Sequence, residues 1–173
     1  VEECSEDQNT VRELFVRALN IALDELTAMR MREGESLKHD MLGKLDTIEL
    51  LRGQIEERAP YVIEEYRDKL SKRLSALLSG DVDEARFMTE VAIFADRAAI
   101  DEELVRLTSH IAQLRAATEM ENPVGRKLDF LVQELNREFN TIGSKASDAQ
   151  IAQCVVEAKG EIEKLREQVQ NIE

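Results

Sequence analysis

Residues 102–110 (EELVRLTSH) contain side chains that could carry out chemistry, and they recur at helical spacing. Glu103 and His110 are seven residues apart, so both lie on one face of a helix, with Arg106 between them. Asp96 continues the same seven-residue spacing upstream. A carboxylate two helical turns from an imidazole is about 10 Å away along the axis. One metal ion therefore needs a ligand from a second element to complete such a site.

A second polar face lies in residues 122–148 (NPVGRKLDFLVQELNREFNTIGSKASD). Asn122 suits the N-cap of a helix and Pro123 its first position. The face combines Asn, Gln, Arg and Asp, whose side chains make directional hydrogen bonds, and the segment is neutral within a chain of net charge -13. An ordinary solvated helix face remains the alternative. The face consists of Arg126, Asp129, Gln133, Asn136, Arg137 and Asn140.

Two facing helices that present carboxylates and one histidine can hold a divalent cation inside a bundle. Asp129, Glu134 or Glu138 of the second stretch would complete the ligands offered by the first stretch. Ligation rich in carboxylates favours Mg²⁺ or Mn²⁺ over Zn²⁺. The alternative is an interhelical salt-bridge network around Arg106 and Arg137.

The run GRKLDFLVQELNREFNTIGSK, followed by the closing REQVQNIE, closely resembles the C-terminal domain of the bacterial YicC/YloC family. The blocks REG with Leu37 and EELVRLTSH extend this resemblance through the whole chain. It implies a stress-associated protein with endoribonuclease activity on RNA. Family members also carry an N-terminal domain, and this chain begins with Val1 rather than Met. We therefore expect residues 1–173 to be the C-terminal, all-helical domain of a larger protein.

The resemblance also implies roles for individual residues. The family usually has an acidic residue three positions before the EE pair, where this chain has Ala99, and a metal ligand at that position would be lost. We hypothesise metal-assisted RNA hydrolysis, while activation of the 2′-hydroxyl by a general base stays open. The implied catalytic residues are Glu103, Arg106, His110, Glu134 and Glu138. The implied RNA-binding residues are Arg126, Lys127, Gln133, Asn136, Arg137, Asn140 and Lys145, and the implied metal ligands are Glu103, His110 and Asp129.

The acidic composition limits this hypothesis. The chain has 36 acidic and 23 basic residues, so it should repel phosphate backbones overall. A positive field for RNA must then be local, come from the N-terminal domain, or arise at a subunit interface. A non-catalytic scaffold or oligomerisation module fits the same residues, as does an adaptor that presents RNA to another nuclease. The sequence shows no nucleophilic Ser/His/Asp set, no P-loop, no Gly-rich dinucleotide turn and no aromatic stacking platform.

The composition, poor in aromatic residues and proline, predicts an all-α fold. Pro60 is expected to end the first helix, and Ser79-Gly80 the second. A first helix of roughly 75 Å must pair along its length with other helices or subunits. We therefore expect an elongated bundle with a long antiparallel hairpin, assembled as a homo-oligomer. The predicted helices span residues 11–59, 62–78, 83–118 and 122–146, with a last helix from 148 onward.

The last predicted helix begins at a cap formed by Ser147 or Asp148. From Ile151 its apolar residues recur in steps of four and three, which is a heptad seam. The seam packs either within the chain or in a subunit contact. No stretch approaches the roughly 20 apolar residues of a membrane span, and no signal peptide opens the chain, so we expect a cytoplasmic protein.

Overall fold

The computed structural model describes residues 8–77, 83–120, 124–170 and 172. The expected all-α class is confirmed, because these described residues form helices and no strand. None of the described helices has both the length and the low polarity that crossing a membrane requires. The helices are α1 (Gln8–Leu77), α2 (Glu84–Ala98), α3 (Asp101–Ala117), α4 (Gly125–Lys145) and α5 (Ala149–Val169).

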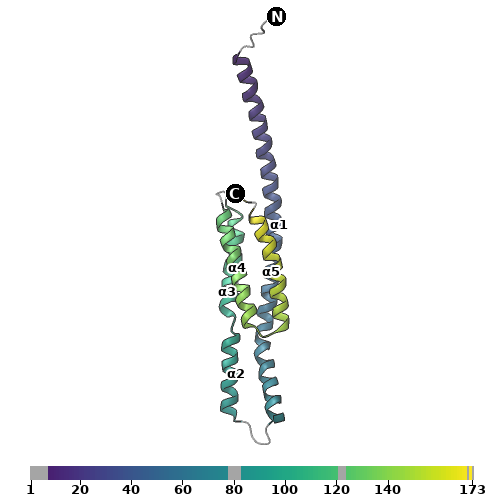
Figure 1. Ribbon diagram of the computed structural model, residues 1–173, viewed down its shortest axis with the longest axis vertical. Coiled ribbons are helices and arrows are strands. Elements are labelled where there is room, and N and C mark those ends of the chain that lie inside the picture. The colour runs from purple at the N-terminus through teal and green to yellow at the C-terminus, as the bar shows by residue number, and fades with distance from the viewer. Residues whose placement is uncertain (1–7, 78–82, 121–123, 171, 173) are drawn as a thin grey trace. The chain divides into compact units, whose positions relative to one another are not determined.

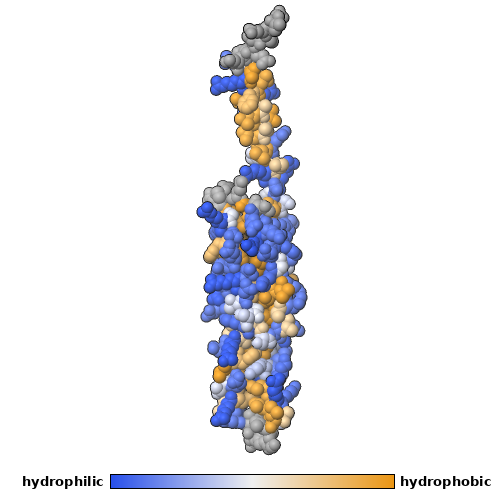
Figure 2. Space-filling model, viewed as in Figure 1, coloured by the Kyte–Doolittle hydropathy of each residue, from blue (hydrophilic) through white to orange (hydrophobic). Residues whose placement is uncertain are grey.

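The chain divides into two compact units, residues 1–40 and residues 41–173. In the first unit, the described residues belong to the N-terminal part of α1. Most of its large apolar side chains are exposed, including Phe15 at 70%, and Leu37 is half-buried. Figure 2 shows such apolar side chains gathered along this part of α1. Residues 8–40, the part of this unit that the structure describes, therefore build no core of their own.

The second unit has its core among residues 41–62 of α1 and helices α3, α4 and α5. Helix α4 packs against both α3 and α5, and Figure 1 shows it beside both of them. The C-terminal part of α1 meets α2, where the rings of Tyr66 and Phe94 stack with centroids 3.7 Å apart. An apolar stripe runs along α4 at helical spacing, and its members Leu128, Leu131, Leu135, Phe139 and Ile142 are all buried.

The last helix follows its sequence pattern. Asp148 is the N-cap of α5, and its side chain accepts hydrogen bonds from the backbone N–H groups of Gln150 and Ile151. Arg58 of α1 donates to the same carboxylate at 2.8 Å. The heptad seam lies in the core of this unit, because its members Ile151, Val155, Ala158, Ile162, Leu165 and Val169 are buried.

The prediction that Pro60 ends the first helix is wrong, because α1 continues through it to Leu77. Proline removes one helical hydrogen bond and normally bends or breaks a helix. Ile55 and Val62 are buried on either side of Pro60, so the core holds both segments in place. Pro60 and Glu56 are exposed, so water can reach the Glu56 carbonyl that loses its backbone donor. The expected stop at Ser79-Gly80 lies outside the described residues.

The single helix predicted for residues 83–118 is also wrong, because the structure has two helices there. The predicted start near residue 83 is confirmed, because Asp83 is the N-cap of α2 and its side chain accepts hydrogen bonds from the N–H groups of Ala85 and Arg86. Helix α2 ends before Ala99, whose backbone is extended (φ −62°, ψ 123°), and α3 begins after the buried Ile100. Asp96 therefore lies on a different helix from Glu103. The residues expected to start the next helix, Asn122 and Pro123, lie outside the described residues.

Candidate functional site

The candidate site lies along the polar rim of the contact between α3 and α4. Leu107 and Leu114 of α3 and Leu135 of α4 are fully buried beneath this rim. Residues three or four positions apart lie on the same side of a helix. The polar residues that flank these leucines therefore lie along the edge of the contact, where they face the opposite helix. The rim consists of Glu103, Arg106 and His110 from α3, with Glu134, Glu138 and Lys145 from α4.

Two cations bind two buried carboxylates at one end of the rim, and one of the cations, Arg106, bridges both carboxylates. Arg106 donates from Nε to Glu138 Oε1 at 2.8 Å and from Nη2 to Glu103 Oε1 at 3.1 Å. Lys145 Nζ donates to the same Glu103 oxygen at 2.9 Å and to the Ala99 carbonyl at 3.1 Å. Glu103 is 3% exposed and Glu138 is 5% exposed. The network ties the end of α4 to the break between α2 and α3.

This network favours the ionised form of Glu103. Burial alone raises the pKa of Glu103, but the hydrogen bond from Lys145 and the attraction of Lys145 and Arg106 outweigh it. The pKa of Glu103 therefore lies below its ordinary value. The hydrogen bond to Glu138 raises the pKa of Arg106 above its ordinary value, so Arg106 stays positively charged.

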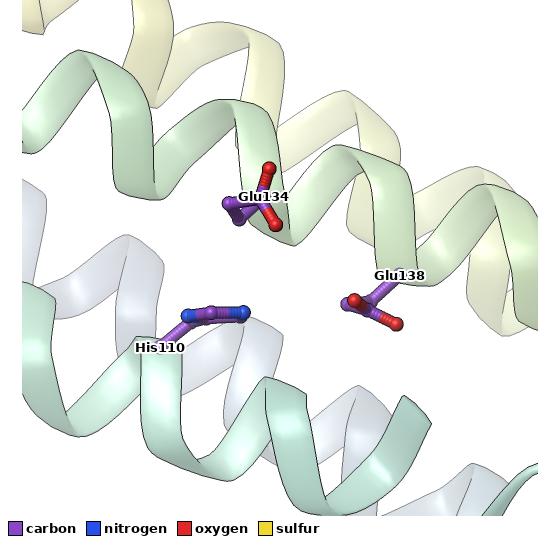
Figure 3. A group of neighbouring side chains, drawn as sticks. All are labelled: His110, Glu134 and Glu138. Carbon is purple, nitrogen blue, oxygen red and sulfur yellow. The ribbon is translucent and has the colours of Figure 1, made fainter. Parts of the chain in front are cut away.

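His110, Glu134 and Glu138 form a second group farther along the rim. Figure 3 shows the imidazole of His110 pointing from α3 toward α4, and the two carboxylates projecting from α4 into the same space. One ligand atom from each of the three residues lies within 4.8 Å of the others. Both ring nitrogens of His110 are buried without a hydrogen-bond partner. Because an unpaired buried polar group is costly, this imidazole is suited to receive a ligand.

The donor set of this group fits a hard divalent cation. Ligands on opposite sides of an octahedral Mg²⁺ ion are about 4.2 Å apart, so small side-chain rotations would close the observed group. The sequence offered Asp129, Glu134 or Glu138 as carboxylates that could complete a site with His110, and the group contains Glu134 and Glu138. Glu103 instead binds Arg106 and Lys145. Asp129 accepts a hydrogen bond from Gln133 at 2.8 Å and is not a member of the group.

Several predicted RNA-binding residues lie on another side of α4. Arg126, Asp129 and Gln133 line a pocket of about 730 Å³ together with Arg166 of α5. Farther along α4, Asn140 donates to Asn136 at 3.4 Å, and Lys159 of α5 donates to Asn140 at 2.8 Å. These residues therefore face the contact of α4 with α5, and the structure does not bring them together with His110.

Two other predicted RNA-binding cations are Arg137 and Lys127. Arg137 lies beside the α3–α4 rim, and Lys127 lies near the start of α4, beyond the end of the rim. Arg137 is 75% exposed, and its Nη1 atom is 3.9 Å from Glu134 Oε1. Lys127 is exposed and its Nζ atom contacts Met120 Sδ at 3.8 Å. Arg137 is therefore the predicted phosphate-binding residue that lies beside the His110 group.

Sequence comparison identifies the family to which this arrangement belongs. The sequence model described as "Endoribonuclease YicC-like, C-terminal" matches residues 55–173. The chain belongs to the YicC-like family. The family resemblance noted from the sequence motifs is thereby confirmed.

Two curated relatives of this YicC-like chain are each named "Probable endoribonuclease YicC". The relative from Clostridioides difficile (strain 630) is 47% identical over 178 residues, and the one from Haemophilus influenzae (strain ATCC 51907 / DSM 11121 / KW20 / Rd) is 37% identical over 174 residues. Each alignment covers 100% of this chain and 60% of the relative. The chain thus spans about 60% of the length of these relatives.

Sequence reasoning on the YicC-like motifs missed that two of the acidic residues are buried. Glu138 lies three residues after Leu135 and four before Ile142, inside the apolar stripe of α4. Glu103 lies four residues before Leu107, in the corresponding stripe of α3. A carboxylate at such a position is a signal for burial beside a cationic partner, and it distinguishes these residues from the exposed Glu102.

Proposed function

We propose that the α3–α4 site, in the full-length protein, cleaves RNA phosphodiester bonds with a divalent cation held by His110, Glu134 and Glu138. The observation that carries this proposal is the grouping of their ligand atoms within 4.8 Å, with both His110 nitrogens buried and unpaired. The names of the curated relatives support RNA as the substrate. A cation bound there would supply a Lewis acid that activates water and offsets phosphate charge.

Neighbouring residues of the chain would prepare this site. Arg106 holds Glu138 through Oε1, so the second carboxylate oxygen is the one available to a cation. Arg137 is exposed beside Glu134, and a guanidinium there can neutralise phosphate oxygens. Glu103 binds Arg106 from the other side and is therefore a positioning residue for Glu138.

The test is an RNA-cleavage assay of the full-length protein with Mg²⁺ or Mn²⁺, and with EDTA. We expect His110→Ala, Glu134→Gln and Glu138→Gln each to lower the cleavage rate by about 100-fold or more, because each removes a ligand. Asp129→Asn is the matched control, since Asp129 is an acidic residue of α4 outside the group. It should leave the rate within about threefold, a change below 1 kcal/mol in the barrier.

The cleavage products separate the two chemical routes. Attack by activated water leaves no 2′,3′-cyclic phosphate, whereas attack by the 2′-hydroxyl produces one. Full activity of the three variants, or full activity in EDTA, would contradict the proposal. Cyclic-phosphate ends would favour the general-base route instead.

Metal binding also has a readout that does not depend on cleavage. A cation that binds only the folded protein stabilises it and so raises its melting temperature. At a cation concentration one hundred times the dissociation constant, the free energy of unfolding rises by about 2.7 kcal/mol. We expect Mn²⁺ to stabilise the wild type and not Glu138→Gln. Equal stabilisation of both proteins would place the cation elsewhere.

We also infer an assembly role for residues 8–40, favoured by a different observation. Phe15, Leu14 and Met31 are each more than 60% exposed on this part of α1. A helix that exposes many apolar side chains requires a partner, and a second copy of the chain would supply one. The double substitution Leu14→Asp and Phe15→Asp should then lower the molar mass measured by light scattering. An unchanged mass would contradict this role.

A further inference from the structure

Phe130 is an exposed aromatic residue on the same row of α4 as two members of the His110 group. Positions 130, 134 and 138 are four residues apart, so Phe130, Glu134 and Glu138 follow one another along one side of the helix. Glu138 is buried and Glu134 is half-buried, while Phe130 is 58% exposed. The row therefore leads from the buried carboxylate outward to an open aromatic face, about 6 Å along the axis from Glu134.

The aromatic residues of the second unit show why Phe130 differs from ordinary core residues. Phe139, also on α4, is fully buried. Tyr66 and Phe94 stack on each other. Phe130 is instead 58% exposed, and the exposed Lys127 and Arg137 lie on the same side of α4. Single apolar residues on a surface are common, so the position of Phe130 beside two cations and the metal-ligand group is the informative observation.

We propose that Phe130 stacks on an unpaired nucleobase of the RNA whose phosphate lies at the His110 group. The inference rests on the proposed function and names its substrate class as single-stranded RNA. Stacking requires a free base face, which a base inside a duplex does not offer to a side chain. The scarcity of aromatic residues argues against a platform for several bases, and one ring contacts one base.

A stacked base would fix the RNA strand in register with the site. Lys127 lies one turn before Phe130, and Arg137 lies two turns after it on the same side, so each can bind a neighbouring phosphate. These cations give the local positive charge that an acidic chain needs for RNA. Phe130 is thus a positioning residue, which selects where a flexible strand is cut and takes no part in bond breaking.

The experiment measures binding of the full-length protein to a fluorescein-labelled, unstructured RNA oligonucleotide by anisotropy, in EDTA so that cleavage does not interfere. Phe130→Leu keeps an apolar side chain but removes the ring, and Phe130→Trp keeps a ring. We expect Phe130→Leu to weaken binding about 5- to 160-fold, which corresponds to the 1–3 kcal/mol typical of base stacking on an aromatic side chain. Phe130→Trp should bind at least as tightly as wild type. Tyr61→Leu is the matched control, because Tyr61 is an aromatic residue of α1 with 57% exposure.

Two substrates sharpen the test. A duplex of the same sequence should bind wild type and Phe130→Leu within about twofold, and an oligonucleotide with abasic sites should abolish the difference between them. Equal binding of the unstructured RNA by both proteins would overturn the stacking contact. It would not bear on the metal site, which the cleavage assay tests separately. A change in molar mass of Phe130→Leu, measured by light scattering, would overturn it in favour of a protein contact. Loss of binding in Phe130→Leu together with full cleavage by Glu134→Gln would support the base contact and contradict the metal site.

Discussion

Helix α4 makes two contacts that differ in chemistry. Toward α5 it presents an apolar stripe that meets the heptad seam, and those residues are buried without charge. Toward α3 it presents an apolar stripe with a polar rim. Among the described residues, the buried charged side chains are Glu103 and Glu138, and both belong to the α3–α4 contact.

The difference shows how one helix can separate stability from chemistry. Burial of apolar surface stabilises a bundle without directional requirements. Buried carboxylates cost free energy unless cations and hydrogen bonds satisfy them, and Arg106 and Lys145 do so for Glu103 only in part. Glu103 Oε2 and both His110 nitrogens have no partner. We infer that the unpaired polar atoms of the α3–α4 contact lower the stability of the fold and leave these atoms able to bind a ligand.

The largest effect should come from the apolar side of α4. Phe139→Ala removes a fully buried ring and should lower the free energy of unfolding by about 3–5 kcal/mol, because a cavity replaces the lost contacts. Phe130→Ala makes the same chemical change on an exposed residue of the same helix and should cost about 0.5 kcal/mol or less. Urea unfolding followed by circular dichroism measures both. Similar losses in the two variants would contradict the assigned core.

A smaller effect is expected at the polar rim. Glu103→Gln keeps the shape of the side chain but removes the charge that binds Arg106 and Lys145, and should cost about 1–3 kcal/mol. Glu102→Gln is the matched control, because Glu102 also binds Arg106 but is 86% exposed, and should change stability by about 0.5 kcal/mol or less. The same unfolding assay applies. If the two variants were equally stable, burial would not distinguish the neighbouring carboxylates.

The elements that the sequence predicted well are those with an uninterrupted local pattern. The stripe of α4 and the heptad seam of α5 repeat regularly, and Asp148 is a typical cap, so local rules suffice. The break at Ala99 was missed although the sequence of residues 83–118 carried a signal. Its apolar residues Phe87, Val91, Phe94 and Ala98 follow one another after three or four positions, but the next in the series, Leu104, comes six positions later. The residues 101–103 (DEE) that follow are typical of a first helical turn.

The helical state of Pro60 and the members of the His110 group could not be assigned from the local sequence pattern. Pro60 stays helical because core residues on both sides hold it, which is a tertiary effect. The choice between Asp129 and Glu138 depends on which side of α4 faces α3, and three acidic residues of α4 satisfied the spacing argument equally. Lys145 reaches the Ala99 carbonyl across 46 positions of sequence, a contact that no periodicity contains.

The smallest effect is expected outside both contacts of α4, at the ion pair between Arg58 of α1 and the cap of α5. The hydrogen bond from Arg58 lowers the pKa of Asp148 below its ordinary value, burial opposes this shift, and the N–H groups of Ile151 and Gln150 add to it. A carboxyl whose pKa is lower in the folded state than in the unfolded state adds stability above the unfolded value. That stability is lost as the pH falls through the folded value.

Asp148→Asn keeps an oxygen that can cap α5 but removes the charge that binds Arg58. We expect a loss of about 1 kcal/mol at pH 7, and this difference from wild type should vanish at pH values below the folded pKa of Asp148. Asp148→Ala also loses the cap and should cost about 1 kcal/mol more at every pH. Urea unfolding at intervals of about one pH unit between pH 2 and pH 7 measures the free energy of unfolding of both variants and wild type as a function of pH. A difference between Asp148→Asn and wild type that does not change with pH would mean that Arg58 acts through packing rather than charge, because only the ionised carboxylate forms the ion pair.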